Sequence, residues 1–416
     1  MDFTLPDHLP GVLAEMDAFI EAEIKPLERE HMQYFDQRRE HARTDWDNDG
    51  IPRREWEDLL GEMRKRADKA GWLRYGLPSQ FGGRDGSNVD MAVIREHLAH
   101  KGLGLHNDLQ DESSIVGNFP QVIMMDRFGT DAQKKDWTEA LITGERSMAF
   151  GLTEPNHGSD ATWLETRAER HGSGKDEVWV INGAKRFNTG VHRATHDLVF
   201  ARTSGEPGQA RGITAFLVPT DTPGFSVPYY WWTFNMPTDH GEVELKDVRV
   251  AADAVLGEVD RGLEVGQTFL HENRIRQAAS SLGAGQYCID RAVAYANDRT
   301  VFGKPLSVNQ AVQWPLVELQ TEAQMVRLLV RFAASELDRN HHMEVSDKVS
   351  MANYRANRLV CEAADRAMQV FGGVGYSRHE PFEHIYRHHR RYRITEGAEE
   401  IQIRRVAQRL FGFGKR

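Results

Sequence analysis

The chain has 416 residues, which is long for one hydrophobic core, so we expect two or three domains. With 40% hydrophobic and 27% charged residues, the composition is that of an ordinary globular protein and excludes an intrinsically disordered chain. The formal net charge of -10 argues against a general nucleic-acid-binding protein, because such proteins need a cationic surface to displace counterions.

The N-terminus and the cysteines bear on the compartment. The first residues lack the basic and apolar regions of a signal or transit peptide, and no apolar run is long enough to span a bilayer. Cys288 and Cys361 both fall inside apolar helical patterns, which predicts buried free thiols rather than a disulfide or a metal pair. We therefore expect a cytoplasmic protein without a membrane span.

The first part of the chain has a helical pattern. The pattern begins at Pro10, its first apolar stripe runs from Val12 to Ile24, and Pro26 is expected to end that helix. Further helices are predicted over residues 53–70, 88–100, 113–128 and 131–141.

An acidic segment interrupts these helices. Asp45, Asp47, Asp49 and Gly50 begin like a calcium-binding loop, but Trp56 stands at the twelfth position, where that loop needs a glutamate. We interpret the segment as a solvated acidic loop and predict no metal site there.

From about Met148 the pattern changes to strands. Val178 to Ile181 is a short β-rich run, and Asn182-Gly183 is typical of a two-residue hairpin turn, so we predict a hairpin that returns through residues 184–189. More strands are expected over residues 198–201, 212–218, 225–227 and 242–250.

Three long helical patterns follow, from residue 263 to 299, from 307 onward, and from 346 to the glycine pair at 372–373. The small residues around Gly283 permit close helix contact. In a last helix, the apolar residues from Ile403 to Phe411 predict one buried face, which would complete a four-helix bundle.

The predicted architecture is therefore an α+β multidomain fold. We expect an N-terminal all-α domain over residues 1–146, a middle β-barrel-like or sandwich domain over 147–257, and a C-terminal four-helix bundle over 258–416.

Glu396 is the main catalytic candidate. It precedes Gly397 near the start of the last helix, where burial and the helix N-terminus act on a carboxylate in opposite directions. Such a carboxylate is a usable base near neutrality. Taken alone, the residue is better explained as a helix-start carboxylate that merely complements the helix dipole.

Four motifs, in order along the chain, resemble signatures of the acyl-CoA dehydrogenase family. They are Gly151–Asp160, Asn182–Thr189, Arg299–Leu306 with Gln310, and Ala367–Tyr376 followed by Glu396-Gly397. The resemblance spans almost the whole chain and implies the family's fold, with a helical domain, a β domain and a helical bundle.

The resemblance implies FAD-dependent α,β-dehydrogenation of an acyl-CoA thioester to the 2-enoyl-CoA. Glu396 would abstract the α-proton while flavin N5 takes the β-hydride, and an electron-transfer flavoprotein would receive the electrons. Some members carry the base at the position of Asn273, whose amide cannot act as a base, and the adjacent Glu272 should point elsewhere on the helix. Glu396 therefore has no competitor at these positions.

The resemblance also assigns binding residues. Those for FAD are Leu152, Thr153, Gly158, Ser159, Phe187, Thr189, Arg299, Phe302, Gln310, Gln369, Gly372, Gly373 and Glu400. Those for the substrate are Ser159, Arg274 and Gly397. No strand-linked GxGxxG motif supports a nicotinamide site instead.

Partners follow from the same resemblance. We expect a homotetramer built as a dimer of dimers, in which Arg299, Phe302 and Gln310 reach the FAD of a neighbouring subunit. The basic run from His384 to Arg393 is interpreted as a solvated charged face rather than an attractor of CoA phosphates, and we predict no zinc site in it.

Two alternatives remain for the function. One is a flavin oxidase or monooxygenase on the same fold, and the other is a catalytically silent acyl-CoA-binding subunit. The segment around the proposed base departs from the family pattern, because Thr395 replaces a common tyrosine, Ala398 removes a hydroxyl and Glu399 adds a charge. These changes leave the local hydrogen bonds and the acyl-chain preference open.

Overall fold

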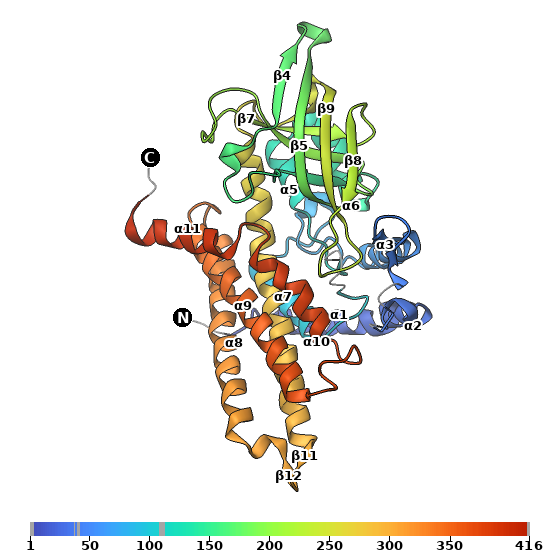
Figure 1. Ribbon diagram of the computed structural model, residues 1–416, viewed down its shortest axis with the longest axis vertical. Helices are drawn as coiled ribbons and strands as arrows, with labels where there is room; N and C mark the ends of the chain where they lie inside the picture. The colour runs from blue at the N-terminus through green and yellow to red at the C-terminus, as the bar shows by residue number, and fades with distance from the viewer. Residues whose placement is uncertain (1–3, 37, 40–41, 108–112, 414–416) are drawn as a thin grey trace. The chain divides into compact units, whose positions relative to one another are not determined.

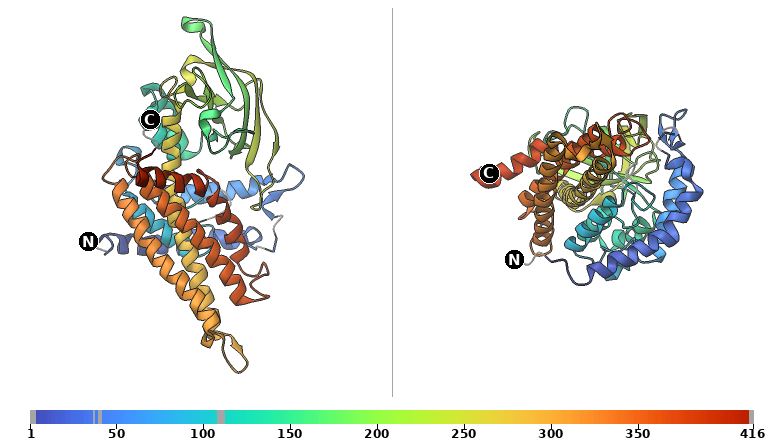
Figure 2. Two further views of the ribbon diagram at one scale, coloured as in Figure 1. Left: turned by 60° about the vertical axis from the view of Figure 1, so that its left-hand side comes forward. Right: turned by 90° about the horizontal axis from the view of Figure 1, so that it is seen from below.

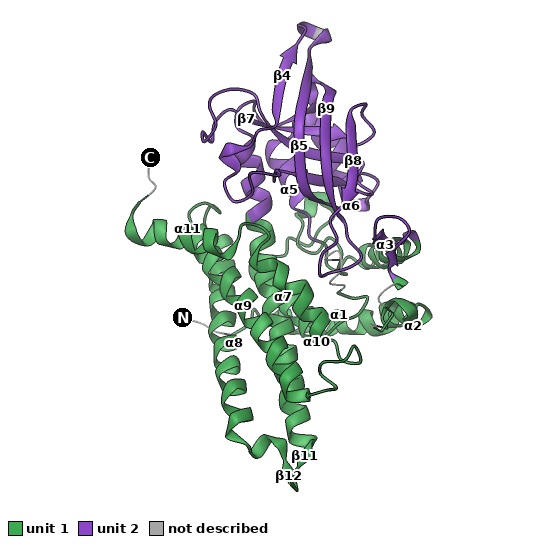
Figure 3. Cartoon of the chain, in the orientation of Figure 1, with its two compact units in different colours: residues 1–42, 55–117, 271–416 green, residues 43–54, 118–270 purple. Residues whose placement is uncertain are grey.

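The structure is a computed structural model that describes all residues except 1–3, 37, 40–41, 108–112 and 414–416 (Figure 1). The chain forms two compact units (Figure 3). The first unit comprises residues 1–42, 55–117 and 271–416, and the second comprises residues 43–54 and 118–270. No helix in the described part of the chain is long and apolar enough to cross a membrane.

The second unit is built on an eight-stranded sheet with the order β10-β7-β6-β4-β5-β9-β8, in which β3 pairs in parallel with β6. The strands are β3 (Met148–Gly151), β4 (Arg167–His171), β5 (Val178–Thr189), β6 (His196–Arg202), β7 (Ile213–Pro219), β8 (Phe225–Tyr230), β9 (His240–Ala251) and β10 (Val255–Leu256). Helices α5 (Pro120–Phe128) and α6 (Asp131–Thr143) belong to the same unit.

Strand β6 explains why this part of the sequence is so apolar. Its side chains alternate between two cores: Leu198 and Phe200 pack with residues of α5 and α6, whereas Val199 and Ala201 pack with residues of β5 and β9. Because both faces of the strand are buried, the sequence reads as an uninterrupted apolar run instead of an alternating one.

The hairpin predicted at Asn182-Gly183 is wrong. Strand β5 passes straight through this pair, with a register shift against β9 between Ile181 and Gly183. The Asn182 side chain bonds Asp247, whose backbone N–H donates to Asn182 Oδ1 at 2.8 Å. A Cβ on Gly183 would lie 2.4 Å from Thr166 Oγ1, so the glycine serves a β-bulge and a close approach rather than a turn.

The first unit is helical. Its helices are α1 (Leu9–Phe19), α2 (Lys25–Glu30), α3 (Arg54–Lys69), α4 (Asn88–His100), most of α7 (Gly262–Asp298), α8 (Gln310–Leu337), α9 (Ser346–Phe371), α10 (Phe382–Arg390) and α11 (Glu399–Phe411). The predicted helices at 53–70 and 88–100 and the three long C-terminal helices are confirmed. The predicted close contact at Gly283 is also confirmed, since a Cβ there would lie 2.2 Å from the carbonyl oxygen of Glu96 on α4.

Two N-terminal predictions need correction. Pro26 does not end the first helix, because it occupies the first turn of α2. In that position the missing N–H of a proline costs no helical hydrogen bond. The helix predicted over 113–128 is confined to α5, which begins at Pro120.

The end of the chain also differs from expectation. The run predicted to be a solvated charged face forms α10, and its three histidines, His384, His388 and His389, are buried. Figures 1 and 2 show α10 beside α9 and α7, where it supplies the fourth helix of the bundle. Helix α11 instead crosses the start of α9, where Arg405 Nε donates to Ser346 Oγ at 2.8 Å.

The apolar face predicted to be buried in α11 lies open in the single chain. Leu410 is 74% exposed and Phe411 is 73% exposed. The residues of α11 that are buried are polar, Glu399 and Gln402. The apolar spacing in α11 therefore does not identify a face that packs on the core of the same chain.

Candidate active site

Glu396 lies on a two-residue turn just before α11. Its φ is 56° and that of Gly397 is 88°, so both residues have left-handed backbone conformations. Arg274 Nε on α7 donates to the carbonyl oxygen of Glu396 at 2.8 Å, and Gln402 Nε2 on α11 donates to that of Gly397 at 2.8 Å. Two helices thus hold the turn through its backbone.

Gly397 is required by its surroundings. A Cβ at this position would lie 2.7 Å from Arg274 Nη2, and the positive φ would strain any other residue. The glycine therefore allows the guanidinium of Arg274 to lie directly against the turn that carries Glu396.

Arg274 is a buried cation beside this carboxylate. Burial lowers its pKa to about 10, while the charge of Glu396 opposes that shift and the nearby Arg405 adds to it. The guanidinium is therefore still charged at neutral pH, and it favours the ionised form of a neighbouring carboxylate. Asn273, at the alternative base position, is buried and accepts a hydrogen bond from Arg276 Nη2 at 3.2 Å.

Glu399 anchors the same segment, a role that sequence reasoning missed. Its carboxylate accepts from Arg393 Nη2 at 2.8 Å and from Arg358 Nη2 at 3.2 Å. The hydrogen bond from Arg393, followed by that from Arg358, outweighs burial and lowers the pKa of Glu399 to about 2. Because Arg393 and Glu399 lie on either side of Glu396, their ion pair closes the loop that presents it.

In the second unit, the loop after β3 carries the first predicted flavin motif. The backbone N–H of Arg186 donates to the carbonyl oxygen of Thr153 at 2.8 Å, which ties the loop to β5. The Glu154 carboxylate accepts from the Thr166 N–H at 3.0 Å and from Lys185 Nζ at 2.7 Å. Burial opposes ionisation here, but Lys185 and the hydrogen bonds outweigh it, so the pKa of Glu154 lies below its usual value.

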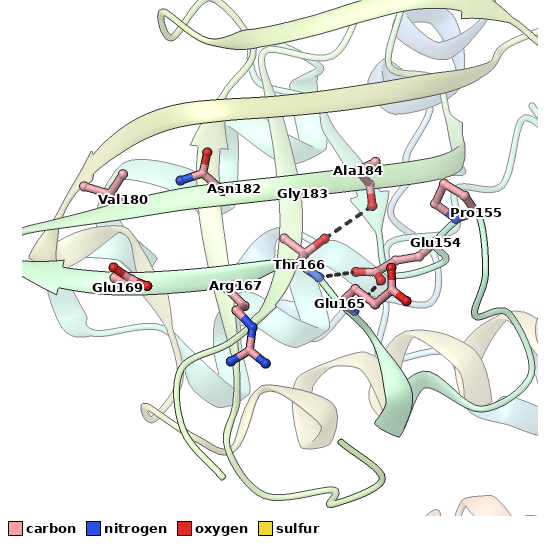
Figure 4. Close-up of a pocket in the computed structure, with 10 residues that line it drawn as sticks. All are labelled: Glu154, Pro155, Glu165, Thr166, Arg167, Glu169, Val180, Asn182, Gly183 and Ala184. Carbon is pink, nitrogen blue, oxygen red and sulfur yellow. Dashed lines mark hydrogen bonds between the residues drawn. The ribbon is translucent and has the colours of Figure 1, made fainter. Parts of the chain in front are cut away.

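A hollow of about 510 Å³ adjoins this loop and the β4–β5 hairpin (Figure 4). At its wall, Thr166 Oγ1 donates to the carbonyl oxygen of Ala184 at 3.3 Å. Leu152 packs at the margin of the core below, whereas Gly158 and Ser159 are exposed. The loop is thus held at Thr153 and Glu154, and it exposes Gly158 and the hydroxyl-bearing Ser159.

The second predicted flavin motif lies on β5. Phe187 has a φ of 59° and is 46% exposed, with its ring centroid 5.3 Å from that of Trp231. Thr189 is also exposed, and its Oγ1 lies 3.3 Å from His240 Nδ1. Asn188 between them points into the core, so the strand displays Phe187 and Thr189 on one accessible face.

The third and fourth motifs meet at one end of the bundle in the first unit. The rings of Tyr295 on α7 and Phe371 on α9 stack with centroids 4.1 Å apart, which brings the ends of these helices together. Phe302, in the turn between β11 (Thr300–Val301) and β12 (Lys304–Pro305), is fully exposed. Arg299, Gln310 and Gln369 are exposed there as well.

Comparisons with known proteins decide the family. Residues 12–145, 149–248 and 260–411 match the models of the N-terminal, middle and C-terminal domains of acyl-CoA dehydrogenases. Acyl-CoA dehydrogenase FadE12 of Mycobacterium tuberculosis is 30% identical over 383 residues, 92% of each chain. The chain belongs to the acyl-CoA dehydrogenase family.

Two further similar proteins support this family assignment. Subunit CarC of the caffeyl-CoA reductase-Etf complex of Acetobacterium woodii is 29% identical over 344 residues, 82% of this chain and 87% of that protein. The solved structure of butyryl-CoA dehydrogenase from Megasphaera elsdenii has a TM-score of 0.78 and 27% identity, covering 99% of this chain and 100% of that one. The predicted three-part fold and enzyme class are confirmed, and the cofactor of this family of dehydrogenases is FAD.

The exposed residues of this acyl-CoA dehydrogenase fit a dinucleotide. Apart from the adjoining residues of the chain, no described residue has an atom within 4 Å of a Cβ built on Gly372 or Gly373, so a ligand can approach the bare backbone. The Arg299 guanidinium forms no hydrogen bond or ion pair with another residue in the described ranges, which leaves it available for a phosphate. An exposed aromatic side chain, Phe302, completes a surface that suits a charged, planar cofactor.

This surface is far from Glu396 within one chain. Arg274 and Asp298, the last residue of α7, are 298 - 274 = 24 residues apart on that helix, which corresponds to roughly 36 Å at 1.5 Å per residue. The residues around Arg299 and Gly372 therefore form a surface separate from the Glu396 turn of the same chain.

Proposed function

We propose that this enzyme oxidises an acyl-CoA thioester to the 2-enoyl-CoA, with Glu396 as the base that removes the α-proton. The observation that carries the proposal is the turn at Glu396, a carboxylate-bearing residue held by Arg274 and Gln402 through two backbone hydrogen bonds. Bound FAD supplies the two-electron oxidation. Asn273 leaves the alternative base position without a carboxylate.

The neighbouring cation suits this role. A carboxylate must be ionised to accept the weakly acidic α-proton, and the buried guanidinium of Arg274 favours that form. Gly397 and Ser159 are proposed as further substrate contacts, and Glu400, exposed in the first turn of α11, as a cofactor contact.

An electron-transfer flavoprotein is the proposed electron acceptor. Support comes from the Acetobacterium woodii relative, which is a subunit of a reductase-Etf complex. We also propose that the enzyme works in the cytoplasm, because both cysteines are free and buried, as a reducing compartment permits.

The proposed assembly is a homotetramer, made as a dimer of dimers. The separation along α7 supports it, because the surface at Arg299 needs the FAD of a second subunit. Helix α8 offers a face for the remaining contacts, with Trp314 64% exposed and Val317, Met325, Leu328 and Phe332 also exposed. We retain residues 1–146, 147–257 and 258–416 as the domains of each subunit.

The test is anaerobic reduction of the bound FAD by a panel of acyl-CoA thioesters, followed as bleaching of the flavin absorbance. Glu396→Gln should lower the reduction rate by roughly 10²- to 10⁴-fold, the usual contribution of a general base. Glu362→Gln, the same change at an exposed carboxylate of α9, is the matched control and should have no effect. Full turnover in Glu396→Gln would falsify the assignment.

The same assay separates the alternatives. A silent acyl-CoA-binding subunit gives no bleaching with any thioester in the panel. An oxidase gives bleaching that reverses rapidly when air is admitted, without an electron-transfer flavoprotein.

A further inference from the structure

A chain of polar side chains crosses the interior of the bundle next to the Glu396 turn. Asn353 and Asn357 lie one turn apart on α9, and both are completely buried. Ser281 on α7 and His389 on α10 are completely buried as well. Polar groups at such depth are costly unless their hydrogen bonds are made, so their partners show what they hold.

The two asparagines bind backbone carbonyls on two different elements. Asn353 Nδ2 donates to the carbonyl oxygen of Arg274 on α7 at 2.7 Å. Asn357 Nδ2 donates to the carbonyl oxygen of Tyr392 at 3.0 Å and to Asn353 Oδ1 at 3.0 Å. The pair therefore connects α7, at the residue that contacts Glu396, to the segment that begins four residues before Glu396.

The donor and acceptor of each of these side-chain hydrogen bonds can be assigned. Carbonyl oxygens only accept, so both amides must present their nitrogen atoms to Arg274 and Tyr392. Asn357 Oδ1 is then the acceptor for the Ser281 hydroxyl, at 2.7 Å. Because that hydroxyl has one proton, His389 Nδ1, 3.0 Å from Ser281 Oγ, must carry a hydrogen and donate it.

We propose that Asn353 and Asn357 are positioning residues for catalysis, which hold α7 and the segment from Tyr392 to Glu396 in register so that Arg274 meets the carbonyl of Glu396. The proposal rests on the proposed function of Glu396 as the base. A residue with a side chain rarely adopts the positive φ of Glu396, so neighbouring groups must impose that conformation. The asparagine pair holds both Arg274 and the segment that ends at Glu396, and so fixes the two partners of the hydrogen bond that imposes this conformation.

The decisive variant is Asn357→Asp, which has the same size. Its carboxylate still accepts from Ser281 but cannot donate to Tyr392 or Asn353. We expect flavin reduction at saturating acyl-CoA to slow by roughly tenfold, because small displacements of a catalytic group are costly, with KM changed by less than about twofold. The acid limb of the pH–rate profile should move to higher pH, because the base then lies less firmly beside the Arg274 cation.

The control is Val349→Ala, one turn before Asn353 on the same helix. Val349 is completely buried and contributes no hydrogen-bonding side chain to the network. This variant should lower the thermal stability of the protein but leave the rate per bound FAD and the pH–rate profile unchanged. A merely structural role for Asn357 predicts the same result for both variants.

If Asn357→Asp does not fold, Ser281→Ala replaces it. That variant removes only the hydroxyl that orients Asn357, and we expect a roughly threefold slower reduction with a pH shift in the same direction. Wild-type rates and pH profiles in the folded variants, together with an inactive Glu396→Gln, overturn the positioning role and leave the proposed function intact. An active Glu396→Gln overturns the proposed function itself.

Discussion

The stability of the second unit should depend on pH through one buried acid, Asp197 on β6. This residue is completely buried, and its Oδ2 accepts a hydrogen bond from Asn188 Nδ2. Oδ1 has no hydrogen-bond partner among the described residues. Burial raises the pKa of Asp197 to about 7, although Asn188 and the charge of Lys185 act in the opposite direction.

The sign of the effect follows from this raised pKa. The unfolded chain releases the proton near pH 3.8, whereas the folded protein keeps it until about pH 7. The stabilisation is complete below pH 3.8 and is lost as the pH rises towards 7, because the folded state must then carry a buried charge. With about 1.4 kcal/mol per pKa unit, roughly 4 kcal/mol is lost across this range.

Asp197→Asn should remove this dependence, since an amide has a similar shape and no charge. We expect the free energy of unfolding of the variant to rise relative to that of the wild type by up to roughly 4 kcal/mol between pH 4 and pH 7. Above pH 7 this difference should stay constant. Urea titrations read by hydrogen–deuterium exchange of peptides from β5 and β6 measure this unit specifically. Asp176→Asn, at an exposed site in the same unit, is the control.

The difference in free energy of unfolding between variant and wild type isolates Asp197, because the contributions of all other titrating groups cancel in it. If that difference does not change with pH, Asp197 is ionised throughout, and the account of an acid kept neutral by burial is refuted.

Three further predictions concern other parts of the protein. Trp314→Glu should give a smaller oligomer in analytical ultracentrifugation, because it places a charge on the exposed face of α8. Gly373→Val should weaken FAD retention in gel filtration, whereas Gly11→Val, at a glycine that is likewise in open space and without a positive φ, should not. Glu399→Gln should destabilise the Glu396 turn by about 2 kcal/mol; the depressed pKa means that this stability is present above about pH 4.5 and is lost as the pH falls through about 2, which acid unfolding tests.

Helical periodicity predicted most helices, but not which faces would be buried. In α10 the histidines are spaced so that His384 and His388 face the bundle, yet neighbouring arginines make the segment look like a solvated surface. In α11 the apolar spacing is clear, but Leu410 and Phe411 remain exposed in one chain. Periodicity identifies an apolar face, while the partner of that face depends on tertiary and quaternary packing.

The hairpin prediction at Asn182-Gly183 is wrong for a related reason. The pair has the composition of a hairpin turn, but contacts with Thr166 and Asp247, distant in sequence, use the same backbone freedom for a bulge. Similarly, the ion pair of Glu399 with Arg393 and Arg358 joins residues without a regular spacing, so no local pattern indicates it.

Backbone conformation provides evidence about the site that is independent of the motifs. Seven non-glycine residues in the described ranges have a positive φ, and four of them are aspartates, which tolerate this conformation. The other three are Phe187, Phe302 and Glu396, each assigned to the site from sequence. Strain of this kind persists only where surrounding contacts impose it, and it concentrates at functional sites. The φ of Glu396 depends on tertiary contacts such as its hydrogen bond with Arg274, so the sequence can name this residue but cannot reveal that the fold holds it in a strained conformation.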